Sequence, residues 1–273
     1  MRTVISHFYN EAYLLPWWLK HHRELFDYGI LINHGSTDDS LDIIRELVPH
    51  WKVVNSTLTY FNAFLTDLEV MNYEKEVMGW KIALNTTEFL LSTVDLSIIE
   101  AHLESEGRIG AACSGYILID NMSDRALSYD TPLLSQINFG FSDNQPDISA
   151  EKRLATGIGI HPGRNRFYHK NIVGMYYPGR HRSFHPDANY RLEDLLIFHC
   201  HHAPWNEQMM QRKLGIASKL DPEDIKHRWG FHHLRSSNEL SAQRETALSL
   251  SYDLTSIDYV NRALMHLKAS ITQ

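Results

Sequence analysis

The chain has 273 residues, of which 43% are hydrophobic and 22% charged, so it can bury the core of one α/β domain with an appendage or of two small domains. Its formal net charge of -7 argues against a nucleic-acid-binding protein, because phosphate contacts need a basic surface. No apolar stretch reaches membrane-spanning length and the N-terminus lacks a signal-peptide pattern, so we expect a cytoplasmic protein without an integral membrane segment.

The first half of the chain alternates β-prone runs with amphipathic helical segments. The expected strands are residues 3–8, 28–33, 51–54, 80–84 and 110–120. Ser36 and Asp39 are spaced as a capping box for the second helix, and Asp95 is expected to cap a later one. This alternation predicts an α/β fold, in which right-handed crossovers join a mostly parallel sheet flanked by helices.

The second half of the chain is less regular. Residues 121–163 are rich in Asp, Ser, Asn, Gly and Pro, which indicates long loops of the kind that often form lids or substrate loops. Residues 166–177 are compatible with a hairpin and residues 195–200 with a last buried strand. Helices are expected at residues 206–220, 239–250 and 256–267. Cys113 and Cys200 lie in apolar strand-like segments and are expected to be reduced core residues.

A polar cluster, Asn85-Thr86-Thr87-Glu88, separates the apolar run 80–84 from Phe89-Leu90-Leu91. Ligands bind beyond the carboxyl ends of parallel strands, and this cluster follows such a strand. Oxygen-bearing side chains are costly between two apolar runs, so we expect them to serve a ligand. The alternative is a polar turn between a strand and a helix.

Three spaced landmarks resemble a family-2-type glycosyltransferase with the GT-A fold. They are Asn10-Glu11 after the first strand, the GSTDDS segment 35–40 after the second, and the polar cluster 85–88 followed by an apolar run. The resemblance covers residues 3–120 well and residues 195–214 more loosely. It implies an enzyme that moves a sugar from a nucleotide-diphosphate donor to a glycan, lipid-linked or other acceptor.

By position, the resemblance assigns contacts with the base and ribose to Asn10, Glu11, Asn33 and Asp38. Asn85 and Thr87 are expected at the diphosphate, and Arg180, in the basic segment 179–182, is expected to help neutralise it. The alternative for Asp38 and Ser40 is that they only cap a helix. The resemblance also divides the chain into a nucleotide-sugar-binding half at residues 1–120, an acceptor-side half at 121–220 that completes the same domain, and a helical extension at 221–273.

The chain departs from the family at the metal motif. The family's Asp-x-Asp holds a divalent cation against the diphosphate, whereas Asn85 and Thr87 stand at those positions here and Glu88 is the remaining carboxylate. Three interpretations follow, in order of preference. They are a Mn²⁺ or Mg²⁺ site of Glu88 with His201 or His181, a metal-independent transferase, and a catalytically inactive module that binds a nucleotide or a glycan.

The histidines allow one further alternative. His199, His201 and His181 have the nitrogen ligands of a zinc site, which would make the chain a histidine-based metal hydrolase.

An inverting transferase also needs a general base for the acceptor hydroxyl, whereas a retaining one does not. We expect the base among Asp143, Asp147 and Glu151 in the loop-rich half. Glu193 and Asp194 precede the last strand and should lie at its opposite end. For Glu88 we expect a catalytic role, so that Glu88→Ala abolishes turnover and leaves the fold intact.

Overall fold

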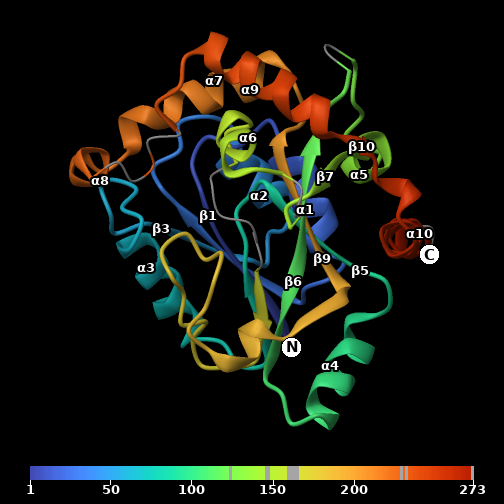
Figure 1. The fold of residues 1–273 in the computed structure, drawn as a ribbon. Coiled ribbons are helices and arrows are strands. Elements are labelled where there is room, and N and C mark those ends of the chain that lie inside the picture. Colours follow the sequence, from blue (N-terminus) through green and yellow to red (C-terminus); the bar gives the residue numbers. More distant parts are fainter. Residues whose placement is uncertain (123–124, 145–147, 159–165, 228–229, 231–232, 272–273) are drawn as a thin grey trace.

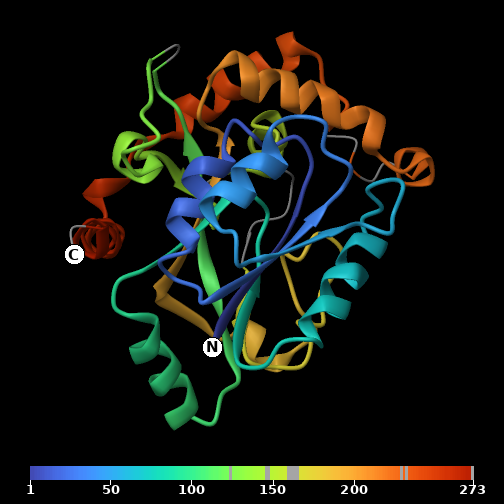
Figure 2. The ribbon, with the colours of Figure 1, turned by 180° about the vertical axis from the view of Figure 1, so that it is seen from behind.

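One mixed sheet forms the centre of the protein, and helices cover both of its faces (Figures 1 and 2). The computed structural model describes residues 1–122, 125–144, 148–158, 166–227, 230 and 233–271. The strand order is β10-β7-β6-β8-β4-β1-β2-β3, with β9 paired to β6 and β5 paired to β9. The predicted fold class, a mixed α/β fold with a largely parallel central sheet flanked by helices, is confirmed.

The strands are β1 (Arg2–Phe8), β2 (Tyr28–Asn33), β3 (Lys52–Asn55), β4 (Trp80–Ala83), β5 (Glu88–Ser92), β6 (Gly110–Ile119), β7 (Phe139–Ser142), β8 (Phe167–His169), β9 (Arg191–His202) and β10 (Tyr252–Asp253). The α-helices are α1 (Leu15–His22), α2 (Ser40–Leu47), α3 (Leu65–Glu74), α4 (Leu96–Ser105), α5 (Leu133–Gln136), α6 (Ala150–Ala155), α7 (Glu207–Gly215), α8 (Pro222–Lys226), α9 (Ser237–Leu250) and α10 (Asp258–Ile271). Short 3₁₀ helices are η1 (Pro186–Asn189), η2 (Ile216–Lys219) and η4 (Leu254–Ser256).

The parallel part of the sheet contains a topological switch point at β1. β1 pairs in parallel with β2 on one side and with β4 on the other. Val4 of β1 packs in the same core cluster as α1 and α2, whereas Ile5 packs in the cluster that contains Val70 of α3. The crossovers before and after β3 therefore cover opposite faces, and Figure 2 shows α1 and α2 in front of the sheet. Crevices for ligands form at such switch points.

The region 166–177 does not form the hairpin that its sequence allows. Residues 167–169 form β8, which pairs antiparallel with both β4 and β6. β4 and β6 run in the same direction but do not pair, and β8 fills the gap between them. The turn residues after His169 instead lead into a long excursion that returns as β9.

Two local expectations are wrong at the residue level. Ser36 does not cap α2, because its hydroxyl accepts a hydrogen bond from the Asn10 backbone N–H, and α2 begins after Asp39 without a side-chain cap. Asp95 precedes α4 but makes no capping hydrogen bond.

The polar cluster 85–88 connects two strands, β4 and β5, and β5 runs antiparallel to β9. It is therefore a strand-to-strand connection.

The C-terminal segment packs on the sheet and also extends it. β10 pairs antiparallel with β7, and α9 and α10 contact β6, β7, β5 and β9. Cys113 and Cys200 are buried and form no disulfide, as predicted. Within the described ranges, no helix is both long enough and apolar enough to cross a membrane.

Candidate functional site

The carboxyl ends of four parallel strands meet at one edge of the sheet. β1, β2, β3 and β4 run in the same direction, so the residues that follow them lie along this edge. Asn10 and Glu11 follow β1, Asn33 and Asn55 end β2 and β3, and Asn85 comes just after β4. α7 and α9 lie across this part of the molecule (Figure 1). The fold thus brings the first three sequence landmarks to one edge.

The loops after β1 and β2 are bonded to each other. Asn10 adopts a positive φ of 52°, and its Oδ1 accepts a hydrogen bond of 2.7 Å from the Thr37 backbone N–H. Asp38 accepts from the backbone N–H groups of Ala12 at 2.9 Å and of Ser40 at 3.1 Å. Asn10 and Asp38 therefore hold the two loops in one shape.

Glu11 is buried at the switch point and pairs with an arginine from the second half of the chain. Its Oε1 lies 2.5 Å from Nη2 of Arg212 on α7. Burial raises the pKa of Glu11, and the Arg212 guanidinium opposes that rise. The ion pair holds α7 over the carboxyl edge.

The end of β2 carries amide and imidazole groups, from Asn33 and His34. Asn33 donates to Asn55 Oδ1 at 3.1 Å and accepts from the Ser36 N–H at 2.8 Å. The His34 ring stacks on Phe61 with centroids 4.0 Å apart. Burial lowers the pKa of His34 to about 4, so the ring is neutral near pH 7.

A histidine–glutamate pair lies beneath this edge. His7 Nε2 is 2.8 Å from Oε2 of Glu69, and both side chains are nearly inaccessible. Burial raises the pKa of Glu69, but hydrogen bonds from His7, Thr57 and Ser56 outweigh it and lower that pKa to about 2. Burial lowers the pKa of His7, which is consistent with a neutral ring that donates to a carboxylate. This pair joins β1 to α3 and to the loop after β3.

Glu88 forms a bidentate ion pair with Arg166. Its Oε1 accepts from Arg166 Nη2 at 2.6 Å and its Oε2 accepts from Nε at 2.8 Å, and both side chains are fully buried. Glu88 Oε2 also accepts from the Asn85 backbone N–H at 2.8 Å. Arg166 donates from Nη1 to the Gly179 carbonyl at 2.8 Å. The polar cluster is thus linked to a distant loop.

That loop, residues 174–184, is called the latch loop below. Asp67 forms an ion pair with Arg180 and accepts from the Gly179 N–H at 2.6 Å. Arg180 donates from Nη2 to Asn85 Oδ1 at 2.6 Å. Arg180 has a φ of 59° and Gly179 a φ of 88°, a conformation that costs free energy for a residue other than glycine. Asp67 and Asn85 therefore hold the latch loop in a strained shape above the end of β4.

The residues of the polar cluster do not fit a divalent cation in this arrangement. Both Glu88 oxygens accept hydrogen bonds from Arg166, and the Asn85 side-chain oxygen accepts one from Arg180. The Thr87 carbonyl accepts from the Cys200 N–H at 2.7 Å. In the part of the chain that the structure describes, no group of three or more His, Cys, Asp and Glu side chains is placed to hold a metal ion.

The histidines of β9 lie beside the polar cluster. His199 is the register partner of Glu88, so the two side chains share a face of the β5–β9 pair. The His199 and His201 rings are 5.3 Å apart, and His201 is partly exposed. His181, on the latch loop, lines a cavity of about 420 Å³ together with Arg166 and Arg182.

The candidates for the general base occupy different environments. Asp143 is fully buried, and its Oδ1 pairs with Nη2 of Arg153 at 2.7 Å. Glu151 is exposed in the first turn of α6. Asp147 lies outside the described residues. Asp194 is near the start of β9 and bonds to Thr93, far along the strand from His199, as expected.

Sequence reasoning missed three charged residues of this site, namely Asp67, Glu69 and Arg212, and it missed that Arg166 pairs with Glu88. The pair of Arg166 with Glu88 spans 78 positions, and no local pattern signals such a pairing. Asp67 and Glu69 are buried on α3 although they look like ordinary helix-surface charges. A buried carboxylate needs a partner, so the position of Glu88 between two apolar runs indicates that a partner exists.

Comparisons with known proteins give no family assignment. No protein-family model matches the chain, and no curated protein does. The structure of TarS from S. aureus is similar over 91% of this chain, with 12% identity and a TM-score of 0.39, and the chain spans 42% of that TarS chain. TarS 1–349 in complex with UDP-GlcNAc matches 98% of this chain at 12% identity with a TM-score of 0.39, covering 83% of that chain. TarS 1–349 in complex with UDP matches 98% at 14% identity with a TM-score of 0.38, covering 87%. TM-scores below 0.5 give these matches no weight for what this chain binds.

Proposed function

We propose that this chain is a glycosyltransferase that moves a sugar from a nucleotide-diphosphate donor to a glycan, lipid-linked or other acceptor. The observation that carries the proposal is the convergence of polar side chains at the switch point between β1 and β4. Asn33, Asn55 and the 10–11 loop line the edge on one side, and Asn85 lies on the other. Amides and carboxylates suit a nucleoside, because the base and ribose offer both donors and acceptors. The motifs 10–11 and 35–40, bonded together at this edge, are the ones that resemble the family.

The second part of the proposal concerns the departing diphosphate, whose negative charge must be stabilised in the transition state. Arg180 and Arg166 are bonded to Asn85 and Glu88, the two polar residues at the ends of the connection after β4. A guanidinium is always charged and binds phosphate oxygens with a planar pair of donors. We therefore propose that these arginines supply the positive charge that Mn²⁺ or Mg²⁺ supplies in the resembled family. No step is assigned to a metal.

One observation favours a second candidate, a catalytically inactive nucleotide-binding module. Glu88 and Asp143, two of the candidate catalytic carboxylates, are both buried in ion pairs. Both oxygens of Glu88 and Oδ1 of Asp143 accept hydrogen bonds from arginine side chains, and neither carboxylate is exposed to receive a substrate proton. A module of this kind would bind a nucleotide diphosphate and would not turn over a nucleotide sugar.

The test is a thermal-shift titration of the full chain with UDP, GDP and ADP, each with Mn²⁺, with Mg²⁺ and with EDTA. A nucleotide that binds only the folded state raises its stability by about 2.7 kcal/mol at a hundred times its Kd. We expect one nucleotide to stabilise the chain in EDTA, and Arg180→Gln to abolish that effect. The exposed Arg45→Gln on α2 serves as the matched control.

Each result has a distinct meaning. Stabilisation that requires Mn²⁺ or Mg²⁺ would retain the donor site and overturn the role of the arginines. Binding without hydrolysis or transfer from the corresponding nucleotide sugars would support the inactive module. A chain that no nucleotide stabilises would overturn the proposed function.

A further inference from the structure

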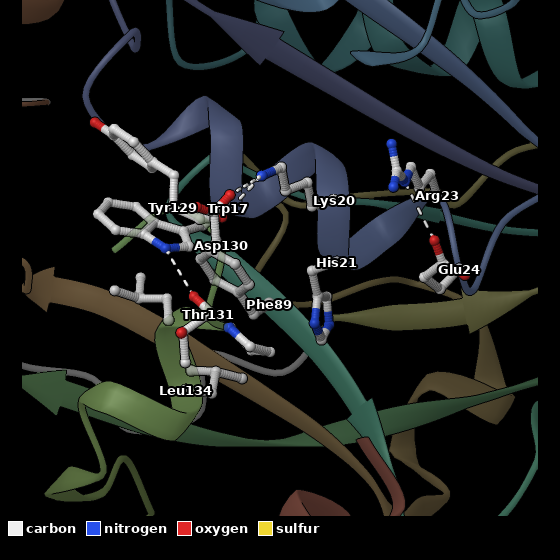
Figure 3. A pocket seen from close by; sticks show the side chains of 12 residues that line it. Trp17, Lys20, His21, Arg23, Glu24, Phe89, Tyr129, Asp130, Thr131 and Leu134 are labelled. Carbon is white, nitrogen blue, oxygen red and sulfur yellow. Dashed lines mark hydrogen bonds and ion pairs between the residues drawn. The ribbon is translucent and has the colours of Figure 1, made fainter. Parts of the chain in front are cut away.

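A second cavity lies on the α1 side of the sheet, away from the polar edge. It has a volume of about 370 Å³ and lies between α1, Phe89 of β5 and residues 129–134 (Figure 3). Its walls include Trp17, Leu133 and Leu134, which are each less than 5% exposed. A cavity of this size with apolar and aromatic walls and a few polar groups is typical of a small-molecule site.

The walls of this cavity are fixed by hydrogen bonds. Trp17 Nε1 donates to the carbonyls of Ser128 at 2.9 Å and Thr131 at 3.1 Å. Lys20 Nζ donates to the Tyr129 carbonyl at 2.9 Å, and the Tyr129 ring lies 4.2 Å from that of Trp17. Figure 3 shows the Trp17 and Tyr129 rings beside each other at the cavity. The site is therefore formed before any ligand arrives, which lowers the entropic cost of binding.

The cavity offers one hydrogen-bond acceptor of fixed type. His21 Nε2 lies 2.6 Å from the Leu90 carbonyl and must donate to it, so Nδ1 carries the lone pair. Burial lowers the pKa of His21 to about 4, which keeps the ring neutral. Nδ1 makes no hydrogen bond to any residue in the described part of the chain. A ligand with an O–H or N–H donor would satisfy it.

The charged side chains at the rim of the cavity disfavour a charged ligand. Lys20 and Arg23 contribute two positive charges, and Glu24 and Asp130 contribute two negative ones. Lys20 lies 3.5 Å from Asp130 and Arg23 lies 3.2 Å from Glu24. An anion or a cation would meet a like charge at this rim, and a purely apolar chain would leave His21 Nδ1 without a partner.

We propose that this cavity binds a neutral saccharide unit. An aromatic wall matches the C–H face of a sugar ring, and hydroxyl groups can donate to His21 and accept from Lys20 or Arg23. Phe89 and Glu88 are adjacent in β5, and successive side chains of a strand point to opposite faces. The cavity is thus on the opposite side of β5 from the Glu88–Arg166 pair. It is a second site, independent of the proposed transferase function.

The test uses saturation-transfer difference NMR on the full chain with maltose, cellobiose and N,N′-diacetylchitobiose as probes. Thr131 is exposed, lines the cavity and makes its hydrogen bond to Trp17 through the backbone, so Thr131→Trp fills the space without removing that bond. We expect at least one probe to bind and Thr131→Trp to weaken it at least tenfold. The matched control is Asn189→Trp at the exposed Asn189 of the other cavity, which should bind as the unaltered chain does.

A second variant keeps the test informative if Thr131→Trp misfolds. Tyr129→Ala removes an aromatic wall without filling the cavity and should also weaken binding, with an unchanged melting temperature. Equal binding by the unaltered chain and both variants would overturn the proposal. So would binding of n-octanol by the unaltered chain in the absence of binding by any of the three saccharides, because it would identify an apolar ligand.

Discussion

Three side chains of α1 complete the hydrogen bonding along the outer edge of β5. Trp18 Nε1 donates to the Glu88 carbonyl at 2.8 Å, and His21 Nε2 donates to the Leu90 carbonyl at 2.6 Å. The Leu90 N–H lies 3.3 Å from Nε2 of His22, whose Nδ1 is 2.9 Å from the Trp18 carbonyl. His22 must therefore be neutral, with its proton on Nδ1. The sequence predicts the helical stripe that contains these residues but not their use as edge caps.

This arrangement predicts a pH-dependent stability. Burial lowers the pKa of His21 to about 4 and that of His22 well below its usual value. Between pH 6.5 and about 4, these two histidines therefore bind protons in the unfolded chain but not in the folded one. The free energy of unfolding decreases as the pH is lowered through that window. Each histidine contributes up to about 1.4 kcal/mol per pH unit.

The measurement is urea unfolding at intervals from pH 7.5 to 4.5. His21→Gln keeps a donor for the Leu90 carbonyl but cannot titrate, so it should flatten the decline. His50→Gln, at an exposed position, is the control and should leave the slope unchanged. A slope that His21→Gln does not reduce would contradict the assignment of a neutral His21.

The Glu88–Arg166 pair gives a second prediction at this scale. Removing one partner of a buried ion pair typically costs about 3–5 kcal/mol, because the other charge is left without a counter-ion. Glu88→Ala should therefore lower the free energy of unfolding by that amount, in contrast to the expectation from sequence that it leaves the fold intact. Glu76→Ala, which breaks the exposed pair with Lys52, should cost at most about 1 kcal/mol.

Urea denaturation of both variants checks this, and the double variant E88M/R166M separates the charge effect from packing. The double variant should be more stable than Glu88→Ala, because it leaves no unpaired charge. Equal stabilities of Glu88→Ala and the unaltered chain would show that the pair does not form.

At the scale of elements, the latch loop depends on α3. Asp67 accepts from both Gly179 and Arg180, across a separation of 113 positions from Arg180. Asp67→Ala should release the loop, because Arg180 has a positive φ and relaxes once its ion pair is lost. Limited trypsin digestion should then cut after Arg180 or Arg182 at least several times faster than in the unaltered chain. Asp42→Ala, which breaks an exposed pair on α2, should leave the digestion rate unchanged.

The region 166–177 shows how far an element of secondary structure can be predicted from its own sequence. The alternation of apolar runs and helical stripes predicts β1 to β4 and α1 to α4 because each is a local pattern with its own period. β8 has only three residues and is defined by its two neighbours, β4 and β6, which the local sequence does not contain. The hairpin expected at 166–177 fails for that reason.

For the whole molecule, the parallel sheet determines where the site lies, and long-range ion pairs determine its chemistry. The strand directions predict that Asn10, Asn33 and Asn85 reach one edge, and they do. The partners of Glu11 and Glu88 come from α7 and from the residue before β8, which the sequence places far away. A buried carboxylate in a sequence predicts that a partner exists but does not identify it.

The C-terminal segment belongs to this whole rather than to a separate unit. β10 pairs with β7, and Leu254 and Val260 are fully buried. A chain that ends at Ser251 would lose several such side chains, each worth about 1.5–3 kcal/mol, against a total stability of about 5–15 kcal/mol. We expect it to lose cooperative thermal unfolding by circular dichroism. Leu264→Lys, at a position 6% exposed, should destabilise the full chain by several kcal/mol, whereas Met265→Lys, at 62%, should have almost no effect. A truncated chain that melts like the full one would mean that residues 252–271 contribute nothing to the core.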